Sequence, residues 1–296
     1  MNEEQKFTYK KILLQTMKDF IEICNNNNIE YIAAYGTVLG TVRHKGLIPW
    51  DDDIDVYMTR DNYQNFLNLK SKLIDTKYEI LDYYTKNYYL PYAKFSNKNT
   101  TIWEKKELPC IVGVFIDIFP LDEVSINTQE VSNLKKQYRK TWDKYYYRYI
   151  RKQTTKTIVK DLFEFKLLNI AKYIFNNTIG QLFRNIVFKH FLQLENEIKK
   201  IKGEKFMYYA THTKSLEKST YPKSWIYNTI EMPFENFKIR IPKQYDQYLK
   251  QEYGNYMQLP PKEYQISHHF HYYVNLEQRL KIDEIIKMNC KNDQSR

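Results

Sequence analysis

The spacing of hydrophobic residues changes twice near the start of the chain. Residues 3–28 carry apolar side chains every three or four positions, which predicts one amphipathic helix. The apolar run 31–35 then predicts a short buried strand. Gly36 and Thr37 follow, and Thr37 is a favourable N-cap for a short helix through Val42.

Short apolar or alternating runs predict the strands of the fold. These runs cover residues 53–56, 78–84, 89–95, 100–103, 112–119, 206–211 and 234–241. Asp61 is expected to cap a helix that ends near Leu73, and Pro120 is expected to end the strand 112–119. Pro242 and Gly254 mark the start and the C-cap of another short helix.

The stretch from about 125 to 202 has helical spacing and no strand pattern. We therefore predict an α/β (α+β) fold in which residues 1–124 and 205–296 form a core with a mixed sheet. Residues 125–204 would form a helical insertion into this core.

The predicted insertion is strongly basic in its first half. Residues 135–160 contain ten lysines and arginines and one acid, Asp143, a local charge of +9 in a chain of net charge +11. Such a segment suits a polyanion, although a solvated helix face explains it equally well. Apolar clusters in 158–191 favour packing on the core over a membrane interface. We expect a peripheral membrane contact through 135–190 and no nucleic-acid partner.

Composition places the chain among folded globular proteins. Of its 296 residues, 43% are hydrophobic and 27% are charged, which is not a disordered composition. No signal-peptide pattern and no run of about 18 apolar residues is present. The three cysteines lack metal-type or redox-type spacing, so a reduced, cytoplasmic protein is expected.

Four aspartates crowd the predicted strand 53–56 and the residues before it. In an extended segment Asp53 and Asp55 point to the same side, about 7 Å apart, while Ile54 and Val56 point to the core. Such a pair suits a hard divalent cation, Mg²⁺ or Mn²⁺. The simpler alternative is a solvated acidic turn.

Two further features fit a metal-bound phosphate. The small residues Gly36 and Thr37 open a helix, whose free N–H groups can approach a phosphate. Asp117 lies alone in the apolar strand 112–119, where a charge is costly without a cation. An Arg or Lys partner would explain Asp117 without a metal.

Residues 35–55, which read YGTVLGTVRHKGLIPWDDDID, resemble the signature of the LicD family. Its members are bacterial phosphocholine transferases related to eukaryotic fukutin and fukutin-related protein. Further similarity lies in residues 92–94, 115–122 and 241–261, whereas 125–205 carries no family motif. The resemblance therefore covers both ends of the chain.

The resemblance implies a nucleotidyltransferase-like fold that moves a phosphorylated alcohol from a CDP-linked donor to a sugar hydroxyl. The leading expectation is phosphocholine from CDP-choline, with lipopolysaccharide, teichoic acid or capsule as the glycan acceptor. By match to the family motifs, Asp53 and Asp55 are the metal-binding pair and Asp117 is the third acid. Gly36 and Thr37 match the phosphate-binding turn.

Cleavage of a pyrophosphate depends mainly on charge neutralisation and in-line positioning. Mg²⁺ on Asp53, Asp55 and Asp117 would stabilise the departing CMP, and Asp117 would accept the proton of the sugar hydroxyl. Arg43 and Lys94 are interpreted as diphosphate ligands. Each could instead be a surface charge or an internal counter-ion, and for Lys45 the two readings weigh equally.

Supporting roles are expected for the remaining polar residues near these motifs. Asp51 and Asp52 would orient waters or the neighbouring loop, and Asp122 would cap or brace. His268, His269 and His271 form a cluster in which His269 and His271 share one side if the chain is extended. We interpret the last two as acceptor or nucleotide contacts.

Alternatives to this function remain open. A reaction of the same class would transfer ribitol phosphate, glycerol phosphate or phosphoethanolamine from a CDP donor with the same acids. The basic segment by itself would also fit a nucleic-acid-binding protein. A nucleotidyltransferase that adds NMP to an acceptor would share the helix turn and the acidic pair.

Overall fold

The computed structural model describes residues 1–106, 108–149, 159, 161–177, 183–213, 215–267, 269 and 271–294. Of the predicted features, His268 and the basic residues Arg151, Lys152, Lys156 and Lys160 lie outside the described residues.

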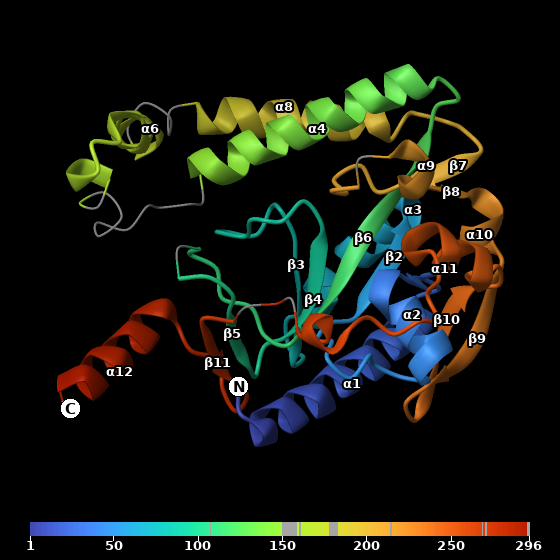
Figure 1. The fold of residues 1–296 in the computed structure, drawn as a ribbon, viewed down its shortest axis with the longest axis horizontal. Helices are drawn as coiled ribbons and strands as arrows, with labels where there is room; N and C mark the ends of the chain where they lie inside the picture. Colours follow the sequence, from blue (N-terminus) through green and yellow to red (C-terminus); the bar gives the residue numbers. More distant parts are fainter. Residues whose placement is uncertain are drawn as a thin grey trace.

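A mixed sheet forms the centre of the fold (Figure 1). Its strands follow the order β1-β2-β6-β4-β3, and β7 pairs with the distal part of β6 and with β8. The pair β2–β6 is parallel, whereas β6 is antiparallel to β4 and to β7. The strands are β1 (Ile32–Ala33), β2 (Asp55–Thr59), β3 (Tyr78–Leu81), β4 (Ala93–Asn97), β6 (Phe115–Val124), β7 (Lys205–Met207) and β8 (Thr220–Pro222).

Two small antiparallel pairs flank this sheet. One is the hairpin of β9 (Thr229–Phe234) and β10 (Phe237–Pro242), and the other joins β5 (Thr101–Trp103) to β11 (Tyr273–Asn275). The β5–β11 pair brings the C-terminal part of the chain back to the first half.

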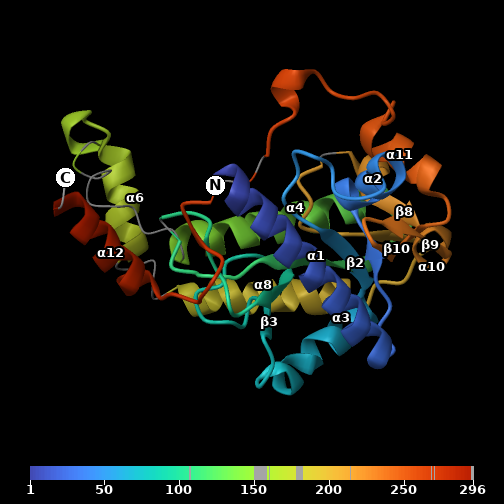
Figure 2. The ribbon, with the colours of Figure 1, turned by 90° about the horizontal axis from the view of Figure 1, so that it is seen from below.

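Helices lie on two sides of the strands (Figures 1 and 2). They are α1 (Glu3–Asn26), α2 (Tyr35–His44), α3 (Arg60–Leu67), α4 (Thr128–Tyr149), α6 (Leu167–Asn177), α8 (Arg184–Ile198), α9 (Leu216–Ser219), α10 (Lys223–Tyr227), α11 (Tyr245–Tyr253) and α12 (Ile282–Gln294), with short 3-10 helices η1 (Asn68–Leu73) and η2 (Lys262–Tyr264). α1 lies at the lower side of the strands in Figure 1, and α4 and α8 run side by side across the upper side. The predicted α/β class is confirmed.

Apolar periodicity explains how α1 packs. Its buried stripe includes Leu13, Met17 and Phe20, and the Phe20 ring lies 5.5 Å from that of Phe66 and 5.7 Å from that of Phe95. Burial of such side chains contributes about 1.5–3 kcal/mol each. This helix confirms the element predicted over 3–28.

A buried ion cluster joins the inserted helices to the sheet. Arg60 at the start of α3 donates to Asp122 on β6 and to Glu195 on α8, and Tyr138 on α4 donates to Glu195 at 2.6 Å. Asp122 therefore braces the fold, as expected. The side chains of Asp122 and Glu195 are almost fully buried, so they depend on Arg60 for neutralisation.

The prediction that Pro120 ends its strand is wrong, because β6 continues to Val124. β4 pairs with β6 only as far as Ile118, and β7 pairs from Asp122 onward. Along a strand, successive backbone N–H groups point alternately to the two neighbouring strands. The Asp117 N–H points toward β2, so the backbone nitrogen of Pro120, three residues later, points to the other side, into the gap between β4 and β7. The N–H that proline lacks would have had no ladder partner there.

Other boundaries also differ from the predicted ones. α2 has Ala34, not Thr37, at its N-cap, and α3 begins after Thr59 and ends at Leu67 before η1. The single strand predicted over 234–241 is a hairpin, which turns at Glu235 with φ 52°. Pro242 ends β10 and does not begin the next helix, whereas the C-cap at Gly254 is confirmed.

Candidate active site

Three adjacent strands place charged side chains in one row. Asp55 on β2 is opposite Asp117 on β6 in the parallel register, and Lys94 on β4 is opposite Asp117 on its other side. Paired positions on neighbouring strands project to the same side of the sheet. The Lys94 ammonium donates to Asp117 Oδ1 at 2.7 Å.

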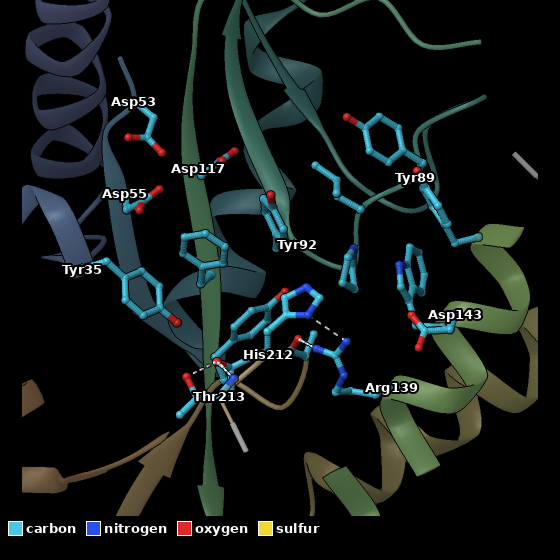
Figure 3. Close-up of a pocket in the computed structure, with 18 of the residues that line it drawn as sticks. Tyr35, Asp53, Asp55, Tyr89, Tyr92, Asp117, Arg139, Asp143, His212 and Thr213 are labelled. Carbon is cyan, nitrogen blue, oxygen red and sulfur yellow. Dashed lines mark hydrogen bonds between the residues drawn. The ribbon is translucent and has the colours of Figure 1, made fainter. Parts of the chain in front are cut away.

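Asp53 precedes β2 and joins Asp55 and Asp117 at the same cavity, which has a volume of about 610 Å³ (Figure 3). Ile54 and Val56 alternate with these acids and are fully buried. The alternation inferred from the sequence therefore holds, although Asp53 lies just outside the strand. The metal-binding role of the three acids stays a prediction.

The first turn of α2 fixes the backbone of Asp55. The Ala34 N–H donates to the Asp55 carbonyl at 2.9 Å, and the Asp55 N–H donates to the Thr37 hydroxyl at 2.8 Å. The Thr37 side chain is buried, so its hydroxyl braces the acid-bearing strand rather than facing the cavity. Its predicted contact to phosphate is not supported by this placement.

Gly36 allows a carboxylate to approach the start of α2. A Cβ at this position would lie 2.9 Å from Asp51 Oδ2, a distance too short for ordinary contact. An anion next to a helix N-terminus is favourable. In this structure Asp51 supplies the anion that was predicted to be a donor phosphate.

Burial and mutual repulsion dominate the electrostatics of the acids. Burial raises the pKa of Asp53 and of Asp55 well above the usual range, and neighbouring carboxylates add to the effect. Burial also raises the pKa of Asp117, although Lys94 opposes this shift. The carboxylate of Asp55 receives no hydrogen bond or ion pair from any described residue. Crowded acids of this kind favour a bound cation, which fits the oxygen-ligand chemistry of Mg²⁺ or Mn²⁺.

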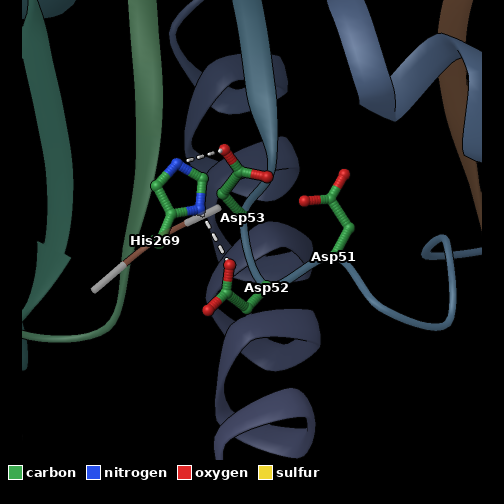
Figure 4. Close-up of side chains that lie close together, drawn as sticks. All are labelled: Asp51, Asp52, Asp53 and His269. Atoms are coloured by element: carbon green, nitrogen blue, oxygen red, sulfur yellow. Dashed lines mark hydrogen bonds and ion pairs between the residues drawn. The ribbon is translucent and has the colours of Figure 1, made fainter. Parts of the chain in front are cut away.

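His269 sits between two of the acids (Figure 4). Its Nδ1 lies 2.8 Å from Asp52 Oδ1 and its Nε2 lies 3.4 Å from Asp53 Oδ2. The hydrogen bond to Asp52 is the main cause that raises the pKa of His269 to about 9, so the imidazole is charged at neutral pH. Candidate ligand atoms of Asp51, Asp52, Asp53 and His269 all lie within 4.8 Å of one another. The predicted metal ligand Asp53 therefore has three close neighbours, Asp51, Asp52 and His269, for which only supporting roles were predicted.

The predicted phosphate-binding cations lie away from the open cavity. Lys94 is buried between Asp117 and Glu104 and is an internal counter-ion, the alternative left open by the sequence. Arg43 donates to the carbonyl of Tyr256 at 2.7 Å and so fixes the segment after α11. The Lys45 ammonium donates to the carbonyl of its neighbour Val42 at 3.1 Å.

His271, the other histidine of the predicted cluster, is buried behind His269. Its side chain is 6% exposed, its Nδ1 lies 4.0 Å from Asp52 Oδ2, and its ring centroid lies 5.9 Å from that of Tyr9. This position indicates that His271 supports the loop that carries His269 rather than contacting a ligand directly.

Sequence reasoning missed the opposite wall of the cavity, which α4 provides. Arg139, Trp142, Asp143 and Tyr146 line this wall. Figure 3 shows Arg139 and Asp143 on α4, with His212 beside Arg139. The spacing of three, four and seven residues places the four α4 residues on one helical face. That spacing was a usable signal, but the basic charge of this segment was interpreted as a surface for a polyanion or as a solvated helix face.

Comparison with known proteins agrees with this geometry. Residues 28–156 match the family described as LicD/FKTN/FKRP, nucleotidyltransferase domain, a span that includes the three acids and the α4 wall. The chain is 30% identical over 264 residues to a Haemophilus influenzae protein named lipopolysaccharide cholinephosphotransferase LicD, which covers 87% of this chain and 93% of that protein.

Two uncharacterised Rickettsia proteins match shorter parts of the chain. The R. typhi protein is 40% identical over 68 residues, which is 23% of this chain and 22% of that protein. The R. prowazekii protein is 32% identical over 155 residues, which is 45% of this chain and 56% of that protein.

Proposed function

The chain belongs to the LicD family of transferases, and on that premise we propose that it transfers phosphocholine from CDP-choline to a sugar hydroxyl of a cell-surface glycan. The name of the Haemophilus relative, a lipopolysaccharide cholinephosphotransferase, supports choline and lipopolysaccharide as the first candidates. The observation that carries the proposal is the convergence of Asp53, Asp55 and Asp117 on one cavity.

In the proposed reaction the sugar oxygen attacks the phosphorus that bears choline, and the bond from this phosphorus to the bridging oxygen of CMP breaks. Asp53, Asp55 and Asp117 would hold Mg²⁺ or Mn²⁺, which when bound neutralises the diphosphate and the leaving CMP. Asp117 accepts the proton of the attacking hydroxyl. The ion pair with Lys94 suits this role, because it fixes Asp117 in the row and opposes the rise in the pKa of Asp117 that burial causes.

The reaction is tested with CDP-choline labelled either in choline or in cytidine, together with a lipopolysaccharide acceptor. We expect the choline label, and not the cytidine label, to enter the glycan. Cytidine label in the acceptor would instead support a nucleotidyltransferase. The protein could instead prefer CDP-ribitol, CDP-glycerol or CDP-ethanolamine to CDP-choline. That result would contradict choline as the transferred alcohol but would support the proposed type of reaction.

We further propose that the inserted helices contact an anionic membrane. Lys140 and Lys144 on α4 share a surface groove with Ile186 on α8. Large apolar side chains of the same inserted segment are also strongly exposed, including Leu162, Phe163, Phe165 and Leu168. Basic side chains are complementary to acidic headgroups, and exposed apolar side chains are complementary to the acyl boundary beneath them. Among the described helices, none is both long and apolar enough to span a bilayer.

Vesicle co-sedimentation checks this contact. We expect more protein to pellet with phosphatidylglycerol-containing vesicles than with pure phosphatidylcholine. The double variant K140Q/K144Q should reduce pelleting, since each basic residue near the surface contributes about 1 kcal/mol. The matched control K238Q/K243Q removes the same charge from residues outside this groove and should pellet like the native protein. Equal pelleting with both vesicle types would contradict the membrane proposal.

A further inference from the structure

The cavity has two walls of different chemistry. The sheet side carries Asp53, Asp55 and Asp117, and the α4 side carries Trp142, Asp143 and Tyr146. Figure 3 shows the three acids of the sheet side, with Asp143 on the opposite side of the cavity. A donor that places its diphosphate at the sheet acids extends its other groups toward the remaining walls. The chemistry of the α4 wall therefore bears on which part of the donor it receives.

Aromatic rings dominate the space between these walls. The ring centroid of Tyr89, from the loop before β4, lies 5.9 Å from that of Tyr146 on α4. Tyr92, Phe119 and Tyr208 form a second group, with centroids 4.5 Å apart for Tyr92–Phe119 and 5.1 Å apart for Phe119–Tyr208. These rings also line the cavity and so present π-faces or edges to a ligand.

Asp143 adds a negative charge to this aromatic wall. It is exposed on α4 and lines the cavity, and no described residue forms an ion pair with it. The nearby guanidinium of Arg139 is directed elsewhere, because it donates to the carbonyl of Ala210 at 2.8 Å and contacts His212 Nδ1 at 3.0 Å. The Asp143 carboxylate is therefore available to a cationic ligand.

Aromatic rings and a carboxylate that line one cavity match the needs of a quaternary ammonium group. Such a group donates no hydrogen bond, and it is recognised by π-faces and by negative charge. We propose that Tyr89, Trp142, Asp143 and Tyr146 form the subsite for the trimethylammonium group of the donor. This assignment rests on the proposed function and adds to it a wall that selects a cationic alcohol over a neutral one such as ribitol.

The competing occupant of this wall is the cytosine base, which also stacks on aromatic rings. The two are separated by comparing CDP-choline with CDP, which has the base and diphosphate but no choline. We expect D143N and Y146L to raise KM for CDP-choline by roughly 5- to 10-fold with kcat little changed. Inhibition by CDP should stay at its native strength. A parallel weakening of CDP inhibition would overturn the assignment and place the base here.

A matched variant controls for the loss of charge. E130Q removes an acid from the first turn of the same helix, outside the proposed subsite, and should leave KM unchanged. Circular dichroism checks that each variant is folded. A native KM for both D143N and Y146L would overturn the subsite.

Binding of free phosphocholine by calorimetry gives a readout that does not need turnover. The native protein should bind phosphocholine more tightly than phosphoethanolamine, and D143N and Y146L should lose this preference. If choline transfer is absent but the preference is present and sensitive to these variants, the proposed function fails and the subsite stands. If choline is transferred but the preference is absent or unaffected by the variants, the subsite alone fails.

Discussion

Replacing Asp55 by asparagine is expected to abolish transfer while the protein stays folded. The Asp55 carboxylate lies in the cavity beside Asp53 and Asp117, and none of the described residues donates a hydrogen bond to it. Loss of a carboxylate that holds a catalytic metal removes several kcal/mol of transition-state stabilisation, or at least about 10³-fold in rate. The backbone contacts of Asp55 to Thr37 and Ala34 do not involve its side chain and should persist.

The thermal stability of D55N should equal or exceed that of the native protein without added metal. The reason is that burial, and after it the neighbouring carboxylates, disfavour the ionised form of Asp55, and an uncharged asparagine is free of both effects. Added Mg²⁺ or Mn²⁺ should raise the Tm of the native protein and have little effect on D55N, since a ligand stabilises only the state that binds it.

Asp75 provides a matched control for this variant. It is an exposed acid between η1 and β3 and does not line the cavity, so D75N should keep native activity and the native response of Tm to metal. Transfer by D55N at the native rate, with the same dependence on metal concentration, would contradict the assignment of Asp55 as a metal ligand.

The local sequence pattern was sufficient to predict which side chains of the acidic segment face the cavity. The alternation of Asp53, Ile54 and Asp55 sets which side chains enter the core and which enter the cavity, and this depends on the extended backbone alone. The pairing of Asp55 with Asp117 requires in addition that two apolar strands become neighbours in the observed parallel register. Such features follow from periodicity and the cost of burying a charge.

Long-range contacts account for what the sequence did not reveal. Arg43 pairs with the carbonyl of Tyr256, 213 residues away, and nothing near Arg43 indicates this partner. Lys94 was correctly placed in a strand, but only the register of β4 with β6 shows that it faces Asp117. Similarly, the course of β6 through Pro120 depends on where β4 stops and β7 starts.

The α4 wall also depends on long-range contacts that the sequence of the insertion does not reveal. Its residues have the spacing of one helical face, but the direction in which that face points is set by tertiary packing. Tyr138 and Trp142 are buried against Phe191 of α8, with centroid distances of 5.2 and 4.7 Å. This packing turns Asp143 and Tyr146 toward the cavity.

Removal of the Arg60 side chain is expected to be the most destabilising single change outside the hydrophobic core. Arg60 neutralises Asp122 and Glu195, whose side chains are 3% and 2% exposed. In R60A these two acids would be buried without a cationic partner. Breaking a buried ion pair in this way costs about 3–5 kcal/mol in the free energy of unfolding.

Urea unfolding followed by circular dichroism measures this loss as a lower midpoint for R60A. The triple variant R60M/D122N/E195Q should recover much of the stability, because it removes the unpaired charges together with the arginine. Since Glu195 also accepts the hydroxyl of Tyr138, R60A should loosen α4 and raise KM for the donor in addition. A free energy of unfolding for R60A within about 0.5 kcal/mol of the native value, the range of ordinary surface substitutions, would show that the cluster does not anchor the inserted helices to the sheet.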